Sequence, residues 1–153
     1  MTAEDRLVVV DGLLGRPFPE EEEQEVPVKG VWEGHRSSGP GYHLCVLKAS
    51  RDFWDDRSED VVEAAEEEID AALHAVSTAL TARWGEPEVI DLWPFLESEN
   101  PAPEPMSELC QLSGRMLAWR RPDAGRWVAL AVGQADPEFP IQLLAAVGET
   151  PLP

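Results

Sequence analysis

The chain has 153 residues, and its 30 Asp and Glu against 12 Lys and Arg give a formal net charge of −18 at pH 7. This length suits one domain, because a chain of this size buries roughly 70% of its unfolded surface. Six tryptophans and a hydrophobic fraction of 43% can supply a core, which excludes global disorder. So negative a field repels nucleic acid and anionic membranes and attracts basic partners. We therefore expect no nucleic-acid binding, no membrane binding, and a basic protein as the partner.

The cysteines and the N-terminus indicate the compartment. Cys45 and Cys110 lack the spacing of a redox or zinc motif, so two reduced, buried thiols are the simplest interpretation. A single disulfide between them is the alternative. The N-terminus is acidic where a secretory leader is basic, and no apolar run is long enough to span a membrane. These features predict a cytoplasmic protein, and the abundance of Ala, Gly, Pro and Arg is typical of a high-GC bacterium.

The first third of the chain has the signals of strands and loops. Residues 7–10 are a short valine-rich run that predicts a strand. Residues 15–27 contain three prolines and four consecutive glutamates, which predict a mobile, exposed loop. Strand-like residues 28–35 and 41–48 flank the turn-forming residues 36–40 and predict a β-hairpin.

The clearest element is a long helix over residues 58–84. Ser58 is a good N-cap, and Gly85 with Pro87 ends the pattern. Apolar side chains recur every three or four residues, which predicts one buried face. They are Val62, Ala65, Ile69, Ala72, Leu73, Val76, Leu80 and Trp84. Alanines line the back of the helix, where they raise helix propensity or permit a second helix to approach.

The C-terminal half predicts a series of strands. Strand candidates lie at 87–92, 114–121, 126–132 and 141–147, with one helical turn at 107–112. Residues 122–125 form the turn of a hairpin, residues 97–106 a mobile proline-rich acidic loop, and residues 148–153 a frayed tail. Because short turns join consecutive strands, the sheet is expected to be antiparallel.

These elements together predict a single α+β domain over residues 1–153. Its antiparallel sheet has about five to six strands, made of an N-terminal hairpin plus a C-terminal meander. One long helix, at about residues 58–84, covers one face of this sheet.

The familiar catalytic motifs are missing from the sequence. It contains no glycine-rich phosphate loop, no GxSxG elbow, no HExxH and no paired CxxC. We therefore assign no catalytic residue and no cofactor, and favour a protein that is not an enzyme. One metal site stays open as an alternative: if His35 pairs with His43 in the first hairpin, Glu33 lies opposite Cys45 and all four share a face. A slip of one residue in the register would destroy that site.

The candidate partner-binding surface joins the side of the long helix to an aromatic residue near its start. The helix carries an acidic flank, defined as Glu59, Glu63, Glu66, Glu67 and Asp70. Trp54 lies next to Phe53 between Asp52 and Asp55, and an aromatic pair framed by acids is typical of a binding patch. The alternative is that this pair folds back onto Val62 as a hydrophobic staple.

The concentrated charge and the missing catalytic motifs favour a small interaction protein of the immunity, antitoxin, adaptor or chaperone type. It would bind a basic protein through the acidic flank and Trp54, with fast and salt-sensitive association. One alternative is a small-ligand- or metal-binding domain, or an enzyme, whose site lies beside residues 97–106 or 134–140. Another is a homodimer with no separable site, joined through the alanine back of the helix or a sheet edge.

Overall fold

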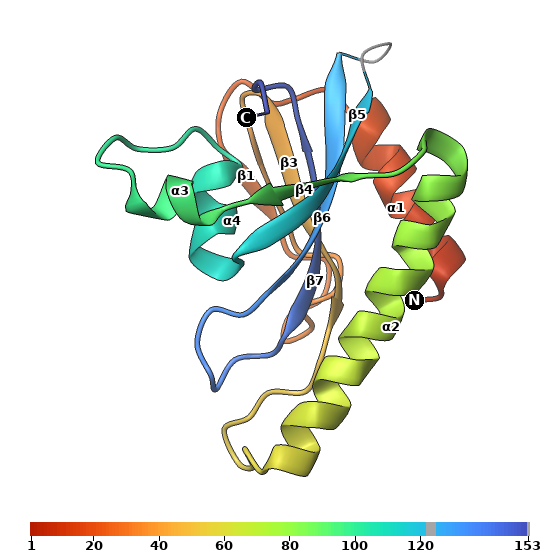
Figure 1. Ribbon diagram of the computed structural model, residues 1–153, viewed down its shortest axis with the longest axis vertical. Coiled ribbons are helices and arrows are strands. Elements are labelled where there is room, and N and C mark those ends of the chain that lie inside the picture. Colours follow the sequence, from red (N-terminus) through yellow and green to blue (C-terminus); the bar gives the residue numbers. More distant parts are fainter. Residues whose placement is uncertain (122–124, 153) are drawn as a thin grey trace.

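A computed structural model describes residues 1–121 and 125–152, which form an antiparallel sheet with helices packed on it (Figure 1). Within these residues the sheet has seven strands in the order β1-β2-β3-β7-β6-β5-β4. The strands are β1 (Glu23–Glu25), β2 (Arg36–Gly39), β3 (Tyr42–Ala49), β4 (Glu88–Asp91), β5 (Arg115–Arg121), β6 (Arg126–Gly133) and β7 (Gln142–Gly148). The predicted α+β class with an antiparallel sheet is confirmed, with slightly more strands than expected.

The N-terminal segment is a helix, so the strand expected at residues 7–10 is wrong. Helix α1 (Ala3–Gly15) begins with a capping box: the Asp5 amide donates to Thr2 Oγ1 over 3.1 Å, and the Thr2 amide donates to Asp5 Oδ2 over 2.8 Å. Val10 and Leu13, three residues apart, are both buried in the core. Their burial on one side of a helix outweighs the strand preference of the valines, which is a weak and context-dependent term.

The first hairpin forms, but in a register different from the expected one. Pro40 and Gly41 make the turn, and Gly41 adopts the positive φ of +84° that favours glycine. Ser38 therefore pairs with His43, and Arg36 with Cys45. The residues expected to be a turn are strand β2, and the strand expected at 28–35 is absent from the structure described. Strand β1 adds three acidic or amide residues of the predicted loop to the sheet edge.

The predicted long helix is confirmed as α2 (Glu59–Trp84), with Ser58 at its N-cap and Gly85 at its C-cap. The Ser58 side chain makes no capping bond; its amide donates instead to Asp56 Oδ1 over 2.9 Å. The C-terminal strands are likewise confirmed, and the predicted helical turn is α4 (Met106–Leu112). A further short helix, α3 (Trp93–Glu97), precedes it. Of the predicted hairpin turn, residues 122–124 lie outside the described residues.

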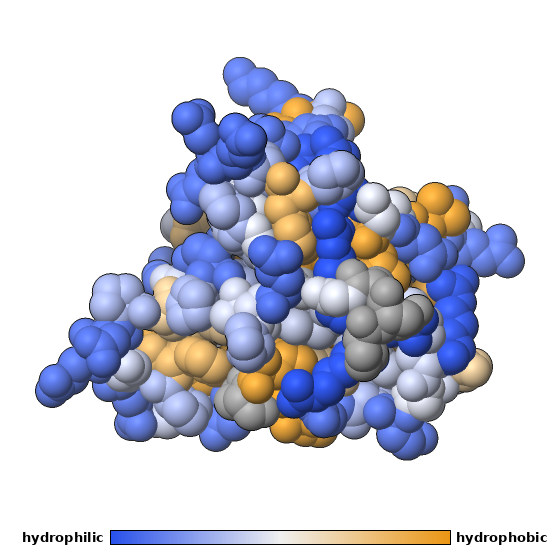
Figure 2. Space-filling view, turned by 90° about the horizontal axis from the view of Figure 1, so that it is seen from above, coloured by the Kyte–Doolittle hydropathy of each residue, from blue (hydrophilic) through white to orange (hydrophobic). Residues whose placement is uncertain are grey.

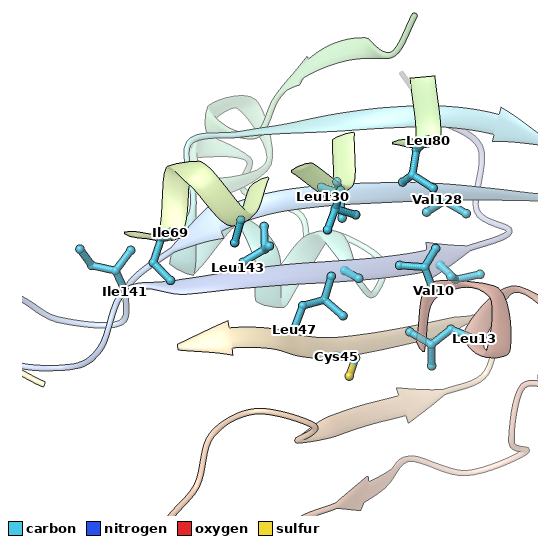
Figure 3. Packing of buried hydrophobic residues seen from close by; sticks show 14 of the residues in the cluster. Val10, Leu13, Cys45, Leu47, Ile69, Leu80, Val128, Leu130, Ile141 and Leu143 are labelled. Atoms are coloured by element: carbon cyan, nitrogen blue, oxygen red, sulfur yellow. The ribbon is translucent and has the colours of Figure 1, made fainter. Parts of the chain in front are cut away.

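Both faces of the sheet are covered, whereas the sequence predicted one. On one face, α1 and α2 direct Val10, Ile69 and Leu80 toward strand residues such as Leu47 and Leu143 (Figure 3). On the other face, a second cluster joins residues of the α3–α4 segment to the sheet: Leu92, Met106, Leu109, Leu44, Ala129 and Leu144. Central strands between two apolar layers are apolar on both faces, which explains the continuous runs in β6 and β7.

Further sequence expectations are met by this two-layered core. On β3, Leu44 and Val46 belong to one cluster, and Cys45 and Leu47 to the other, as strand alternation predicts. Cys45 and Cys110 are free thiols in different clusters, which excludes the disulfide alternative.

In the tail expected to fray, the Thr150 carbonyl accepts a hydrogen bond of 2.7 Å from the Trp127 indole. Among the described residues, no helix is both long and apolar enough to cross a membrane.

Candidate functional site

The acidic flank lies along α2, on the side that faces solvent. All five of its carboxylates are exposed, because they alternate with the buried stripe of Ala65, Ile69 and Ala72. They extend over about 16 Å of helix at about 1.5 Å per residue. Within the described part of the chain, none of them forms a salt bridge. Neighbouring Glu68, by contrast, pairs with Lys48 over 2.9 Å. The acidic flank is therefore a row of uncompensated negative charge.

Trp54 lies just before α2 and remains at the surface, with 61% of its side chain exposed. Its ring meets the ring of Phe139 edge-on, with the centroids 5.5 Å apart. Phe53 is only 1% exposed and belongs to the core cluster that also contacts Val62. Of the two adjacent aromatic residues, Phe53 is therefore part of the core and Trp54 is exposed. Phe139 escaped sequence analysis because a single aromatic residue between prolines forms no pattern.

The loop that carries Trp54 is held against the β6–β7 loop. The Phe53 amide donates to the Glu138 carbonyl over 2.9 Å, and Arg57 pairs with the Glu138 carboxylate over 3.0 Å. Ser50 Oγ accepts a hydrogen bond of 2.9 Å from the Ile141 amide. These contacts fix the segment on both sides of Trp54, so the exposed indole is presented from an ordered position.

An open cavity of about 370 Å³ lies between the acidic flank and the end of the sheet where β6 finishes. Glu66 and Asp70 of α2 border it, together with Leu112, Gln134 and Ile141. The rest of its lining comes from the ends of α4 and β6 and from residues that follow them. Two members of the acidic flank thus border a cavity that reaches the edge where the β6–β7 loop begins.

A second cavity, called here the apolar cavity, has a volume of about 400 Å³ and lies between the β1–β2 edge, α4 and the β6–β7 loop. Most of its wall is apolar, with Val26, Trp32, Leu44, Val46, Leu112, Phe139, Pro140 and Leu144. Polar side chains also line it, among them Glu108 and His35. In the described structure His35 Nε2 is buried without a hydrogen-bond partner. The sequence placed an alternative site beside residues 134–140, and this cavity borders that loop.

Among the carboxyl groups that line the apolar cavity, Glu108 is the one whose pKa is raised. Desolvation raises the pKa of its carboxyl above the ordinary value of 4.5, and the nearby carboxylates of Glu104 and Glu22 raise it further. A hydrogen bond from Ser37 acts in the opposite direction. No described cation forms an ion pair with Glu108. Glu108 is thus a partly desolvated acid that forms no salt bridge with a described residue.

The register of the first hairpin does not assemble the metal site that the sequence left open. Ser38, and not His35, lies opposite His43, and Arg36 lies opposite Cys45. Glu33 accepts a hydrogen bond of 3.4 Å from the Ala49 amide. No group of three or more metal-ligating side chains is present among the residues described. The expected register is wrong because Pro40–Gly41, and not residues 36–40, makes the turn.

His43 instead belongs to a buried polar network. Since the Arg16 carbonyl can only accept, His43 Nε2 donates to it over 3.1 Å, and Nδ1 accepts from the Ser38 hydroxyl over 2.6 Å. Arg36 donates to Ser38 Oγ and pairs with Glu25 over 2.7 Å. Burial lowers the pKa of His43, which keeps the imidazole neutral at pH 7.

Neither this network nor the neighbouring thiol has the geometry of a nucleophilic site. Ser38 and His43 are both 0% exposed, so a substrate cannot reach the hydroxyl in this structure. Burial raises the pKa of the Cys45 thiol to about 11, which makes its thiolate scarce at neutral pH. The network therefore joins α1, β2 and β3 and is structural.

The end of the molecule opposite the start of α2 is seen in Figure 2. There, hydrophilic side chains separate several small apolar patches. Scattered apolar residues of this kind are normal on a protein surface. Comparison of the chain with family models, curated proteins and solved structures finds no match. Function is therefore inferred from the surfaces and cavities of this molecule alone.

Proposed function

We propose that the chain is a non-enzymatic, cytoplasmic protein-interaction domain that binds a basic protein through the acidic flank and Trp54. The observation that carries the proposal is the row of five exposed carboxylates on α2, none of them paired with a described cation. A basic partner would supply the missing counter-charges. Immunity proteins, antitoxins, adaptors and chaperones are the classes in which we would first look for such a role.

Electrostatic attraction and aromatic contact would contribute differently to this complex. Like charges concentrated on one surface accelerate encounter with an oppositely charged partner by roughly 10- to 1,000-fold, and salt screens the effect. Trp54 is exposed and held in place by Phe139, so burying it costs little conformational entropy. We expect the acidic flank to set the association rate and Trp54 to set the lifetime of the complex.

The test compares two variants of equal net charge with the natural protein. The flank variant carries Glu59→Gln, Glu63→Gln, Glu66→Gln, Glu67→Gln and Asp70→Asn. The matched control neutralises five exposed acids elsewhere, with Glu20→Gln, Glu21→Gln, Glu86→Gln, Glu97→Gln and Glu99→Gln. Stopped-flow association with a lysine-rich peptide, measured from low salt to ~0.5 M, reports the local field. We expect the flank variant to associate at least about tenfold more slowly at low salt and the control to change much less.

Equal slowing of both variants would show that only net charge matters and would contradict the proposal. An association rate that salt leaves unchanged would contradict it as well. Trp54→Ala should leave the association rate within about twofold and raise the dissociation rate, because aromatic contacts act after encounter.

The alternative proposal is a homodimer with no separable site, joined through the alanine back of α2 or a sheet edge. The alanines on the back of α2 are exposed, namely Ala64, Ala71, Ala75 and Ala82. A native mass that stays monomeric at high protein concentration would remove this alternative and leave the acidic interaction in place.

A further inference from the structure

The apolar cavity has the size and lining of a small-molecule site. Its volume of about 400 Å³ falls within the usual range for ligand pockets, roughly 300–1,000 Å³. Its walls come from elements distant in sequence: Leu44 and Val46 on β3, Leu112 on α4, and Phe139 on the β6–β7 loop. Trp32 adds an aromatic side chain that is 40% exposed. An apolar group of a ligand would thus be surrounded by four separate segments.

Three charged side chains line this mostly apolar space: Glu108, Glu25 and Arg36. The Glu108 carboxyl is partly desolvated, and the charged groups that raise its pKa, Glu104 and Glu22, are also acids. Ser37 on β2 donates a hydrogen bond to it. Glu25, which also lines the cavity, is already paired with Arg36 over 2.7 Å. Glu108 is therefore the lining carboxylate that still lacks a described cation.

We propose that the apolar cavity binds a small organic cation, an amine with an aromatic or alkyl body whose ammonium group pairs with Glu108. The apolar body would displace water from Leu44, Val46 and Leu112, which is favourable in proportion to the area removed from water. The ammonium group would relieve the repulsion among Glu108, Glu104 and Glu22. An anion of the same size would be repelled by these acids, and Arg36, the arginine of the lining, is already paired with Glu25. This site goes beyond the proposed protein interaction, because it uses neither the acidic flank nor Trp54.

The experiment titrates the protein with three probes of similar size and different charge. They are 2-phenylethylamine, 2-phenylethanol and 3-phenylpropanoate, followed by amide chemical shifts in NMR up to millimolar concentrations. We expect the amine to shift the signals of cavity residues with a Kd of about 1 mM or tighter, the alcohol to bind at least about tenfold more weakly, and the carboxylate not to bind. Affinity for the amine should rise with pH above the ordinary carboxyl pKa of 4.5, as Glu108 loses its proton.

Three variants locate the site. Glu108→Gln should weaken the amine at least about tenfold without affecting the alcohol. Ala135→Trp, on an exposed position that lines the cavity, should block both the amine and the alcohol without disturbing the core. Glu86→Gln, an exposed acid remote from the lining, is the matched control and should bind as the natural protein does.

Three results would overturn the proposal. Equal affinity for the amine and the alcohol, unchanged in Glu108→Gln, would show an apolar void without cation recognition. Amine binding that persists in Ala135→Trp but disappears in the five-residue flank variant would show attraction to the surface of α2 only. Absence of any shift at millimolar amine would exclude the site, and would leave the proposed protein interaction to its own test.

Discussion

At the scale of single residues, the buried polar groups are of two kinds. His43, Ser38 and Arg36 satisfy one another and a backbone carbonyl, so their burial is compensated. Glu108 is different, because its desolvation and its acidic neighbours both disfavour the charged form. A carboxylate placed in such surroundings lowers the stability of the native state at neutral pH and is commonly retained at a binding site.

Glu108→Gln is expected to raise the free energy of unfolding at neutral pH. The folded pKa of Glu108 lies above its unfolded value of about 4.3, so native protein holds this proton more tightly than unfolded protein. This tighter proton binding stabilises the native state fully below the unfolded pKa, and the stabilisation is lost as pH rises through the folded pKa. Glutamine does not titrate, so urea unfolding should show the gap between variant and natural protein widening as pH rises above the unfolded pKa of about 4.3.

Glu86→Gln is the control for that series, since its side chain is exposed and forms no ion pair with a described residue. Its stability should follow that of the natural protein at every pH within about 0.5 kcal/mol. A constant gap between Glu108→Gln and the natural protein across the pH range would contradict the assignment of a raised pKa to Glu108.

At the scale of elements, the N-terminal helix depends on a residue more than a hundred positions away. The Arg126 guanidinium donates to the carbonyls of Leu13, Leu14 and Arg16 over 3.3, 3.0 and 2.7 Å. It also lies 3.8 Å from the centroid of the Phe18 ring. These carbonyls belong to the end of α1, where helices leave acceptors unpaired, and the last turn of α1 has no basic residue of its own.

Arg126→Ala is expected to destabilise the protein by about 2 kcal/mol, because it removes charge-assisted hydrogen bonds from partly buried carbonyls. Arg126→Lys should recover only part of this loss, since an ammonium group can donate hydrogen bonds but cannot place a guanidinium plane over the Phe18 ring. Urea unfolding measures both. The control is Arg83→Ala, which breaks an exposed pair with Asp11 and should cost about 1 kcal/mol or less. Equal losses for Arg126→Ala and Arg83→Ala would contradict the capping role.

At the scale of the whole molecule, one sheet serves two apolar layers. Trp119 belongs to the layer under α1 and α2, and Trp127 belongs to the layer under α3 and α4. Adjacent residues of the same strands enter opposite layers, so neither layer can lose its packing while the other keeps an intact sheet. We therefore expect cooperative unfolding of both layers together.

Leu109→Ala tests this expectation from the smaller layer. Leu109 is 1% exposed, and its truncation should lower the free energy of unfolding by about 2–5 kcal/mol. Tryptophan fluorescence and far-ultraviolet circular dichroism should report the same, shifted midpoint, because both layers unfold as one unit. Two separate transitions, with the α3–α4 layer melting first, would contradict the coupling of the layers.

Local patterns determined much of the fold of this protein. The regular stripe of α2, its flanking Ser58 and Gly85, and the alternation within β3 depend on near neighbours in sequence, so they were readable without coordinates. The acidic flank was readable for the same reason, since it is the exposed side of the same periodic helix. That it meets a basic partner stays a prediction.

Only the tertiary structure decided the rest, because those features arise from contacts between distant segments. The valines of residues 7–10 favour a strand by composition, and packing against the sheet with a cap from Arg126 makes them helical. In the first hairpin, the dipeptide Pro40–Gly41 is a local turn signal, but the competing turn formers at 36–39 become strand β2 when β2 pairs with β3 and β3 with β7. The apolar cavity has walls from segments far apart in the sequence, and the raised pKa of Glu108 depends on their coming together.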